Sequence, residues 1–208
     1  MSTLLGNPLW FATRATGSIA LILLTATVVL GIAGAGRYAP SAVGRFEVAA
    51  LHRNLSLLCL ALLAVHIGTA LADSYVPLGW ISGLVPFVSP YRTLWTGLGT
   101  VAFDLLLTVA LTSALRLRMG LRRWKATHFL AYAAWPAAVF HAAGTGSDTK
   151  LGPQTVLYLL CAAAVLLACW WRLYHAGPGR VAARAWAAVL CVALSVGFYG
   201  FLHDGGHR

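Results

Sequence analysis

Residues 47–72 read EVAALHRNLSLLCLALLAVHIGTALA. Leucine, alanine and valine dominate this stretch, and a helix of this length is long enough to cross the hydrocarbon core of a bilayer. The stretch also carries two histidines, His52 and His66. Ionisable side chains are rare inside membrane spans and mark functional sites there. The sequence therefore predicts a transmembrane helix with chemically active side chains.

The composition of the whole chain agrees with a membrane protein. Of its 208 residues, 60% are hydrophobic and only 10% are charged, and the mean hydropathy is +0.78. A soluble domain carries about a quarter charged residues. An ordinary soluble enzyme, a disordered chain and a soluble nucleic-acid binder are therefore excluded. Because a helix satisfies its own backbone hydrogen bonds in lipid, we predict an all-α, polytopic membrane helix bundle.

Six apolar runs along the chain give six transmembrane helices. We expect them at Thr13–Gly34, Glu47–Ala72, Leu94–Leu117, Trp124–Ala143, Thr155–Tyr174 and Val181–Leu202. The connection Asp73–Thr93 is the longest, contains three prolines and is rather apolar. We expect it to lie in the membrane interface or to fold back over the bundle. No stretch remains for a second domain, so residues 1–208 are predicted to form one transmembrane domain.

The basic residues predict the orientation in the cell membrane. The chain has 15 Lys and Arg against 5 Asp and Glu, and eleven of the 15 lie in or beside the loops after spans one, three and five. Cytoplasmic loops of membrane proteins carry such an excess of Lys and Arg. We therefore expect these three loops in the cytoplasm and both termini outside it. The excess requires no nucleic-acid partner.

Four histidines fall at matched depths of two predicted helices. His52 and His66 are separated by fourteen residues, and His128 and His141, in the fourth predicted span, by thirteen. These separations correspond to about 20 Å along a helix. Both helices enter the membrane from the cytoplasmic side. His52 and His128 should therefore pair near the inner surface, and His66 and His141 near the outer surface.

Three kinds of site fit such pairs: bis-histidine heme, another metal, or a proton path. Zinc and copper sites usually gather ligands a few residues apart, often with Cys, Asp or Glu. Two levels about 20 Å apart instead suit two flat macrocycles held between helices, with imidazoles in both axial positions.

The helical rotation of the two pairs differs. Fourteen residues fall about 40° short of four turns, so His52 and His66 share a helix face; thirteen fall about 140° short. On a straight helix, His128 and His141 would thus point to different sides. Pro136 lies between them, and we expect a kink at this proline to turn His141 back.

The residues around the histidines carry a family resemblance. The chain resembles the ferric reductase-like transmembrane superfamily, which includes NADPH oxidases, ferric reductases and the heme-binding subunit of periplasmic methionine sulfoxide reductase. The resemblance covers about residues 14–174 and leaves 181–202 as an additional helix. It rests on the H-x13-H and H-x12-H pairs, Tyr91-Arg92-Thr93-Leu94-Trp95, Gly97-x-Gly99, Thr112-Ser113-x-Leu115-Arg116, and Trp124-x-x-x-His128 with Tyr132.

This resemblance implies two heme b groups. His52 and His128 would ligate the inner heme iron, and His66 and His141 the outer heme iron. Heme propionates are anionic and bind cations, so Arg53 and Arg92 are predicted as further cofactor-binding residues. No side chain is predicted to be catalytic.

The function implied is electron transfer across the membrane. A cytoplasmic flavoprotein reductase or a membrane quinol would be the separate donor. Ferric iron, a flavin-bearing protein or a repair reductase would be the extracytoplasmic acceptor. The sequence contains no GxGxxG element for a flavin or nicotinamide domain after the last span. We therefore expect the heme-binding membrane subunit of an oxidoreductase rather than an NADPH-oxidising enzyme.

Two other functions compete with this prediction. The histidines of a proton or metal transporter or channel would relay protons or bind the transported metal. Such a path needs polar residues along its length, yet Asp104 is nearly the only acid inside the predicted spans. The chain would otherwise be a purely structural subunit of a larger complex.

Overall fold

The computed structural model describes residues 8–35, 44–73, 76, 78–146 and 152–175, with isolated positions between 182 and 197. Every regular element in these residues is a helix. Their bounds are α1 Pro8–Ala35, α2 Arg45–Ala72, η1 Trp80–Gly83 (a 3₁₀ turn), α3 Thr93–Ala114, α4 Arg116–Met119, α5 Leu121–His128, α6 Ala131–Thr145 and α7 Gly152–His175.

Four of these helices, α1, α2, α3 and α7, are long and apolar enough to cross a membrane. They correspond to the first, second, third and fifth predicted spans. The all-helical membrane fold is thus confirmed. The sixth predicted span, Val181–Leu202, lies for the most part outside the described residues, so the total of six stays a prediction.

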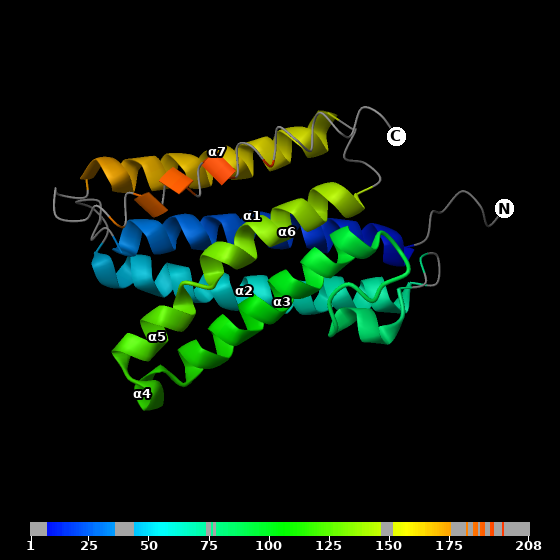
Figure 1. Cartoon of the computed structure of the whole chain (residues 1–208), viewed down its shortest axis with the longest axis horizontal. Coiled ribbons are helices and arrows are strands. Elements are labelled where there is room, and N and C mark those ends of the chain that lie inside the picture. Colours follow the sequence, from blue (N-terminus) through cyan, green and yellow to red (C-terminus); the bar gives the residue numbers. More distant parts are fainter. Residues whose placement is uncertain are drawn as a thin grey trace.

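The fourth predicted span, Trp124–Ala143, is not one regular helix in the structure. It is divided into α5 and α6, which follow one another with a kink (Figure 1). At the kink, backbone N–H groups bond to the third preceding residue: Leu130 to Thr127 and Tyr132 to Phe129, both at 3.0 Å. The interruption therefore lies before Pro136, which sits inside α6.

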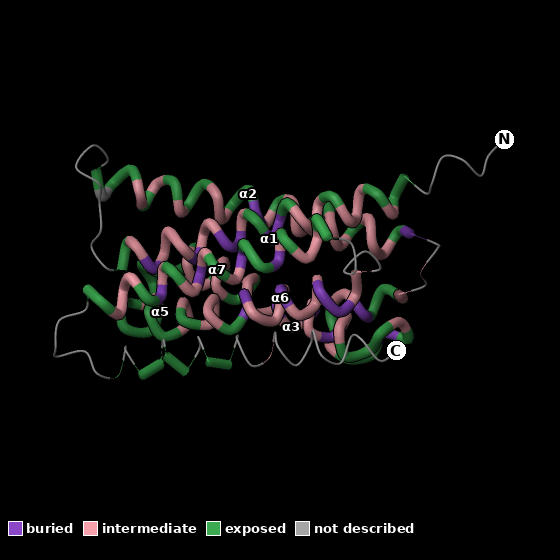
Figure 2. Tube along the Cα trace, turned by 90° about the horizontal axis from the view of Figure 1, so that it is seen from above, coloured by how far each residue is buried: buried purple, intermediate pink, exposed green. Residues whose placement is uncertain are grey.

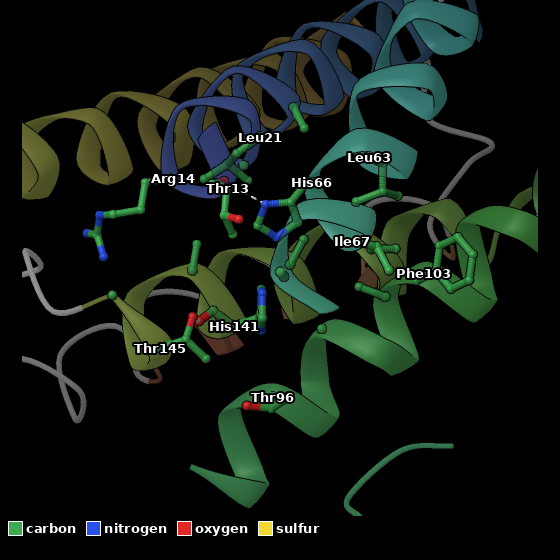
Figure 3. Close-up of a pocket in the computed structure, with 18 of the residues that line it drawn as sticks. Thr13, Arg14, Leu21, Leu63, His66, Ile67, Thr96, Phe103, His141 and Thr145 are labelled. Atoms are coloured by element: carbon green, nitrogen blue, oxygen red, sulfur yellow. Dashed lines mark hydrogen bonds between the residues drawn. The ribbon is translucent and has the colours of Figure 1, made fainter. Parts of the chain in front are cut away.

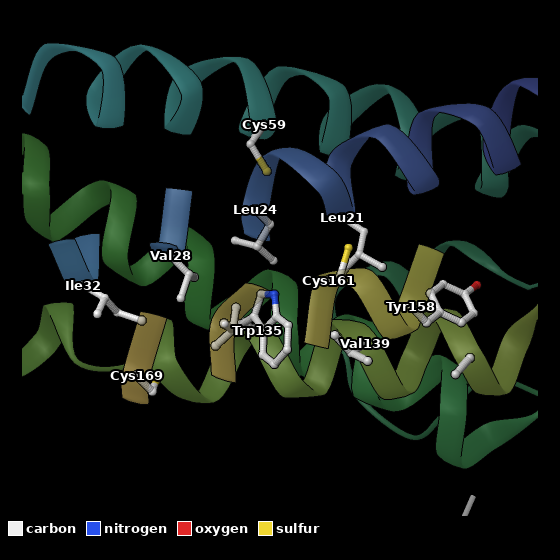
Figure 4. Close-up of a cluster of buried hydrophobic side chains, with 12 residues drawn as sticks. Leu21, Leu24, Val28, Ile32, Cys59, Trp135, Val139, Tyr158, Cys161 and Cys169 are labelled. Carbon is white, nitrogen blue, oxygen red and sulfur yellow. The ribbon is translucent and has the colours of Figure 1, made fainter. Parts of the chain in front are cut away.

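Helix α1 forms the centre of the bundle. It packs against α2, α6 and α7, and its buried positions recur every three or four residues, as expected for a helix face. These side chains meet those of α6 and α7 around Trp135, which is 1% exposed (Figure 4). The α1 residues of this core are Leu21, Leu24, Val28 and Ile32. Because lipid is as apolar as these side chains, close packing is what holds the helices together.

Helix α2 lies at the edge of the bundle. Cys59 is its only fully buried residue among those described, and the rest of the helix is partly or largely exposed (Figure 2). Helix α2 packs along α1, while α3 packs along α6. Two helix pairs, α1–α2 and α3–α6, therefore face each other, and the histidines of α2 approach those of α5 and α6 across the space between the pairs.

The connection between α2 and α3 folds back on the bundle, one of the two placements predicted from the sequence. The Thr100 hydroxyl donates to the Ser82 carbonyl at 2.7 Å, and the Phe87 ring rests on α3 at Gly97, where a Cβ would collide with it. Trp80 and Leu84 are 74% and 70% exposed. Exposed apolar side chains at the end of a span are typical of the membrane interface.

Candidate functional site

The structure brings the four histidines together as two pairs. The ring centroids of His52 and His128 are 6.2 Å apart, and those of His66 and His141 are 6.3 Å apart. His52 and His66 extend from α2, His128 ends α5, and His141 lies near the end of α6. The pairs are the same as those that the sequence predicts.

The kink before α6 helps His128 on α5 and His141 on α6 to face the same neighbouring helix, α2. In a 3₁₀ turn each residue rotates the chain by about 120° around the helix axis, about 20° more than in an α-helix. The tight bonds around Phe129 and Leu130 therefore turn His141 towards the side of His128. The sequence expectation placed the kink at Pro136; the structure shows the interruption earlier, at Phe129 and Leu130, with Pro136 inside α6.

Three of the histidines are oriented by backbone carbonyls. The Nδ1 atoms of His52, His66 and His141 lie 3.0, 2.8 and 2.9 Å from the carbonyl oxygens of Thr27, Thr13 and Trp95. A carbonyl oxygen only accepts hydrogen bonds, so each Nδ1 carries the proton and donates it. The lone pair of each imidazole is consequently on Nε2, the atom left for a metal.

His128 has a different environment. Its Nδ1 is 3.4 Å from the hydroxyl oxygen of Ser113, which also accepts the indole N–H of Trp124 at 3.3 Å. The Trp124 ring lies beside the His128 ring, with 5.1 Å between centroids. The inner pair thus has one carbonyl and one hydroxyl partner, whereas the outer pair has two carbonyl partners.

The separation of the rings permits a test for a shared metal. An imidazole nitrogen lies about 2.0 Å from a bound transition metal and roughly 1.1 Å from its own ring centre, so opposite ligands have centroids about 6.2 Å apart. Both observed separations, 6.2 and 6.3 Å, are within 0.1 Å of this value. The ring planes are tilted by 58° and 81° to each other, and rotation about a common axis leaves the metal bonds unchanged. The residues present therefore fit bis-histidine ligation of one metal per pair.

The donor set also limits the kind of metal centre. Among the described residues, no group of three or more His, Cys, Asp and Glu side chains is placed to hold a metal ion. A structural zinc site requires four protein ligands. A pair of histidines suits a metal that brings its remaining ligands, as iron does in heme.

A cavity of about 800 Å³ surrounds the outer pair. Figure 3 shows the rings of His66 and His141 facing each other across it, with Phe103 and Ile67 on one side and Arg14 at the far end. Its lining comes from α1, α2, α3, α6 and α7 and is mostly apolar. Such a volume and lining are typical of cofactor sites.

The predicted propionate-binding arginines do not line this cavity. Arg92 is exposed and is not one of the cavity-lining residues; its guanidinium donates to the carbonyl of Gly144 near the end of α6. Arg53 is exposed on α2 beside His52. Arg14 instead lines the cavity, with its guanidinium 4.8 Å from the centroid of the Trp10 ring. The roles of Arg53 and Arg92 at a cofactor stay predictions.

The sequence analysis missed the part that α1 plays at this site. Both histidines of α2 donate to carbonyls of α1, those of Thr13 and Thr27. These two residues are fourteen positions apart, the same spacing as His52 and His66. This equal spacing on two neighbouring helices was the signal in the sequence that could have predicted the contact.

Comparison with known families gives one match. The family described as the ferric reductase like transmembrane component matches residues 16–139, more than half of the chain. The matched region includes His52, His66 and His128 and ends two residues before His141. No curated protein and no solved structure matches the chain. The match confirms the resemblance read from the sequence, and the chain belongs to the ferric reductase-like transmembrane component family.

Proposed function

We propose that the chain is a di-heme b-type cytochrome that carries electrons across the cell membrane. The proposal rests above all on the two histidine pairs, whose ring separations of 6.2 and 6.3 Å suit two imidazoles on one iron. Membership of the family indicates transmembrane electron transfer, and domains of this family typically bind heme. The number of hemes and their ligands are our proposal.

In this proposal, His52 and His128 hold the inner heme, and His66 and His141 hold the outer heme. Heme b, when bound, supplies one-electron redox chemistry between ferric and ferrous iron. The protein contributes the geometry: the carbonyls of Thr13, Thr27 and Trp95 fix the ring orientations. Fixed second-shell partners of this kind hold a metal ligand in one tautomer and raise its basicity.

The core between the two levels keeps water away from the path. Cys59, Trp135 and Val139 are all less than 5% exposed and lie between the histidine pairs along their helices. Apolar surroundings lower the dielectric constant around both sites, and this influences redox potential. We assign packing roles to these side chains.

The proposed partners are a separate donor and a separate acceptor. A flavoprotein reductase or a membrane quinol would deliver electrons at the side of His52 and His128. Ferric iron, a flavin-bearing protein or a repair reductase would accept them at the side of His66 and His141. The inner side is assigned from the basic residues of the loops and is part of the proposal.

A pyridine hemochrome assay on the purified protein tests this function. We expect a b-type spectrum and about two hemes per chain, one for each histidine pair. The double variant His52→Ala/His66→Ala should lose both hemes. His175→Ala is the matched control, because this histidine is exposed and packs beside Trp171 at the end of α7.

The assay also separates the competing functions. A folded wild-type protein without heme would overturn the proposal and favour a transporter or channel. Heme that persists in the double variant would mean that other residues are the ligands.

A further inference from the structure

A repeated arrangement surrounds the histidines. Each of the three carbonyls that accepts a histidine Nδ1–H is followed, four residues later, by a glycine whose missing Cβ would face the same histidine. Thr13 precedes Gly17 at His66, Thr27 precedes Gly31 at His52, and Trp95 precedes Gly99 at His141. The first two sets lie fourteen residues apart on α1 and the third is on α3.

Helix geometry explains why the fourth residue matters. The carbonyl of residue i already accepts the backbone N–H of residue i+4, and its second lone pair remains available. A Cβ on residue i+4 leans towards the N-terminus of its helix, over that carbonyl. Glycine leaves this space open, so an imidazole from a neighbouring helix can approach.

The contacts at Gly17 and Gly99 are close enough for a Cβ to matter. A Cβ on Gly17 would lie 2.8 Å from Cε1 and Nδ1 of His66, and one on Gly99 would collide with the ring of His141. A Cβ on Gly31 would lie 3.4 Å from the nearest atom of His52, an ordinary van der Waals contact. Since glycine costs a helix about 1 kcal/mol relative to alanine, its use at these positions calls for a reason.

The fourth histidine shows a variant of the arrangement. Fourteen residues after Trp95 and Gly99, helix α3 has Val109 and Ser113. Ser113 thus stands at the position of the glycine, and its hydroxyl, 3.4 Å from Nδ1 of His128, is the partner of the ring. A side chain that fills the space has replaced the carbonyl as the partner.

We propose that Gly17, Gly31, Gly99 and Ser113 are positioning residues that set the orientation and second-shell partner of each proposed heme ligand. Three sites use a glycine to open a carbonyl to the imidazole, and the fourth uses a serine hydroxyl. The part of this inference that concerns heme rests on the proposed function. The orientation of the histidine rings does not depend on heme.

Alanine substitutions test the glycines at the outer site. Gly17→Ala and Gly99→Ala should each weaken outer-heme binding about 10- to 100-fold, the usual effect of losing a second-shell partner, and leave the inner heme in place. Heme transfer to excess apomyoglobin measures the release of each heme. Gly68→Ala and Gly34→Ala are matched controls, because a Cβ on either meets nothing within 4 Å. Equal heme release in the Gly17 and Gly68 variants would overturn the proposal.

The inner site gives a graded test. Gly31→Ala should change inner-heme release little, because its Cβ makes only an ordinary contact, whereas the larger Gly31→Val should raise it. Release that is as fast in Gly31→Ala as in Gly31→Val, or loss of both hemes together in either variant, would point to general helix packing and contradict the proposal.

Ser113 offers a test in the opposite direction. Ser113→Ala removes the hydroxyl and keeps the Cβ, whereas Ser113→Gly removes both and opens the carbonyl of Val109 to His128. We expect Ser113→Gly to retain the inner heme better than Ser113→Ala, although alanine is the better helix former. The reverse order would refute the assignment of Ser113.

A heme-free measurement keeps this inference separate from the proposed function. Solid-state ¹⁵N NMR of histidine-labelled protein prepared without heme reports which ring nitrogen is protonated. The wild type and Gly68→Ala should show the Nδ1–H tautomer for His66, and Gly17→Ala should lose it. If the wild type binds no heme but shows this difference, the proposed function fails and the positioning role stands. If the tautomer is unchanged in Gly17→Ala, the positioning role fails.

Discussion

The indole N–H of Trp135 donates a hydrogen bond to the hydroxyl of Thr25 across 3.0 Å. This bond joins α6 to α1 in the buried core, and the Thr25 hydroxyl in turn donates to the carbonyl of Leu21 at 2.8 Å. Trp135 lies between His128 and His141 in the sequence and is 1% exposed. This hydrogen bond therefore holds α6, which carries His141, against α1, whose carbonyls orient the two histidines of α2.

The first prediction concerns this bond. Trp135→Phe should destabilise the protein by about 1–3 kcal/mol, because it removes a buried hydrogen bond and part of a core side chain. Thr25 keeps the carbonyl of Leu21 as a partner, so no buried hydroxyl is abandoned. Thermal unfolding in detergent measures the change. Trp170→Phe, at a position 68% exposed on α7, should alter the unfolding temperature much less; equal effects would show that the buried bond contributes nothing.

The second prediction concerns the pairing of the histidines. His52→Ala and His128→Ala should give the same spectrum, with one heme lost, because their rings share one site. His66→Ala and His141→Ala should give a second, different spectrum, also with one heme lost. Low-temperature difference spectra and redox titration show whether the one heme that remains in each variant is the inner or the outer heme. Matching spectra for His52→Ala and His66→Ala would show that the rings pair differently.

The sequence predicted these pairs well because depth along a helix follows directly from residue spacing. The rise per residue is fixed, so His52 and His128 had to lie near one surface and His66 and His141 near the other once the spans were placed. Hydropathy also identified α1, α2, α3 and α7, since each is a long apolar run. These features depend only on periodicity and composition.

Other features of the site left no such pattern. The interruption at Phe129 and Leu130 is made by tight backbone hydrogen bonds. Pro136 was the visible signal in the sequence, and it predicted a kink but not the residues at which the interruption begins. The acceptors of the histidine protons are backbone carbonyls, so their side chains did not mark this role; only the spacing of Thr13 and Thr27, equal to that of His52 and His66, pointed to it. Gly99 was noted only as part of the Gly97-x-Gly99 motif, and Gly17 and Gly31 were not singled out, because the role of each glycine depends on a histidine ring from another helix.

The third prediction concerns orientation in the membrane. In a background without native cysteines, the variant Pro90→Cys should react with a membrane-impermeant maleimide in intact cells. The variant Arg118→Cys should react only after the membrane is opened. Both positions are exposed in the structure, and the excess of basic residues beside Arg118 predicts that its loop is cytoplasmic. Labelling in the reverse order would exchange the inner and outer sites.

The last prediction separates Arg14 from Arg92. Arg14 lines the outer cavity, so its positive charge should favour the reduced heme, which carries one positive charge less than the oxidised heme. Arg14→Gln should therefore lower the outer midpoint potential by a few tens of millivolts, since a one-electron couple shifts about 59 mV per tenfold change in its equilibrium constant.

Arg92→Gln should act on stability instead. Its guanidinium donates to the carbonyl of Gly144 near the C-terminal end of α6, where a cation stabilises a helix by about 0.3–1 kcal/mol. We expect a lower unfolding temperature and unchanged potentials. Redox titration and thermal unfolding of both variants decide between these roles. The opposite result would be a fall in the outer midpoint potential of Arg92→Gln with no change in Arg14→Gln. The positive charge that acts on the outer heme would then come from the loop before α3 rather than from α1, and Arg92 would be the propionate partner that the sequence predicts.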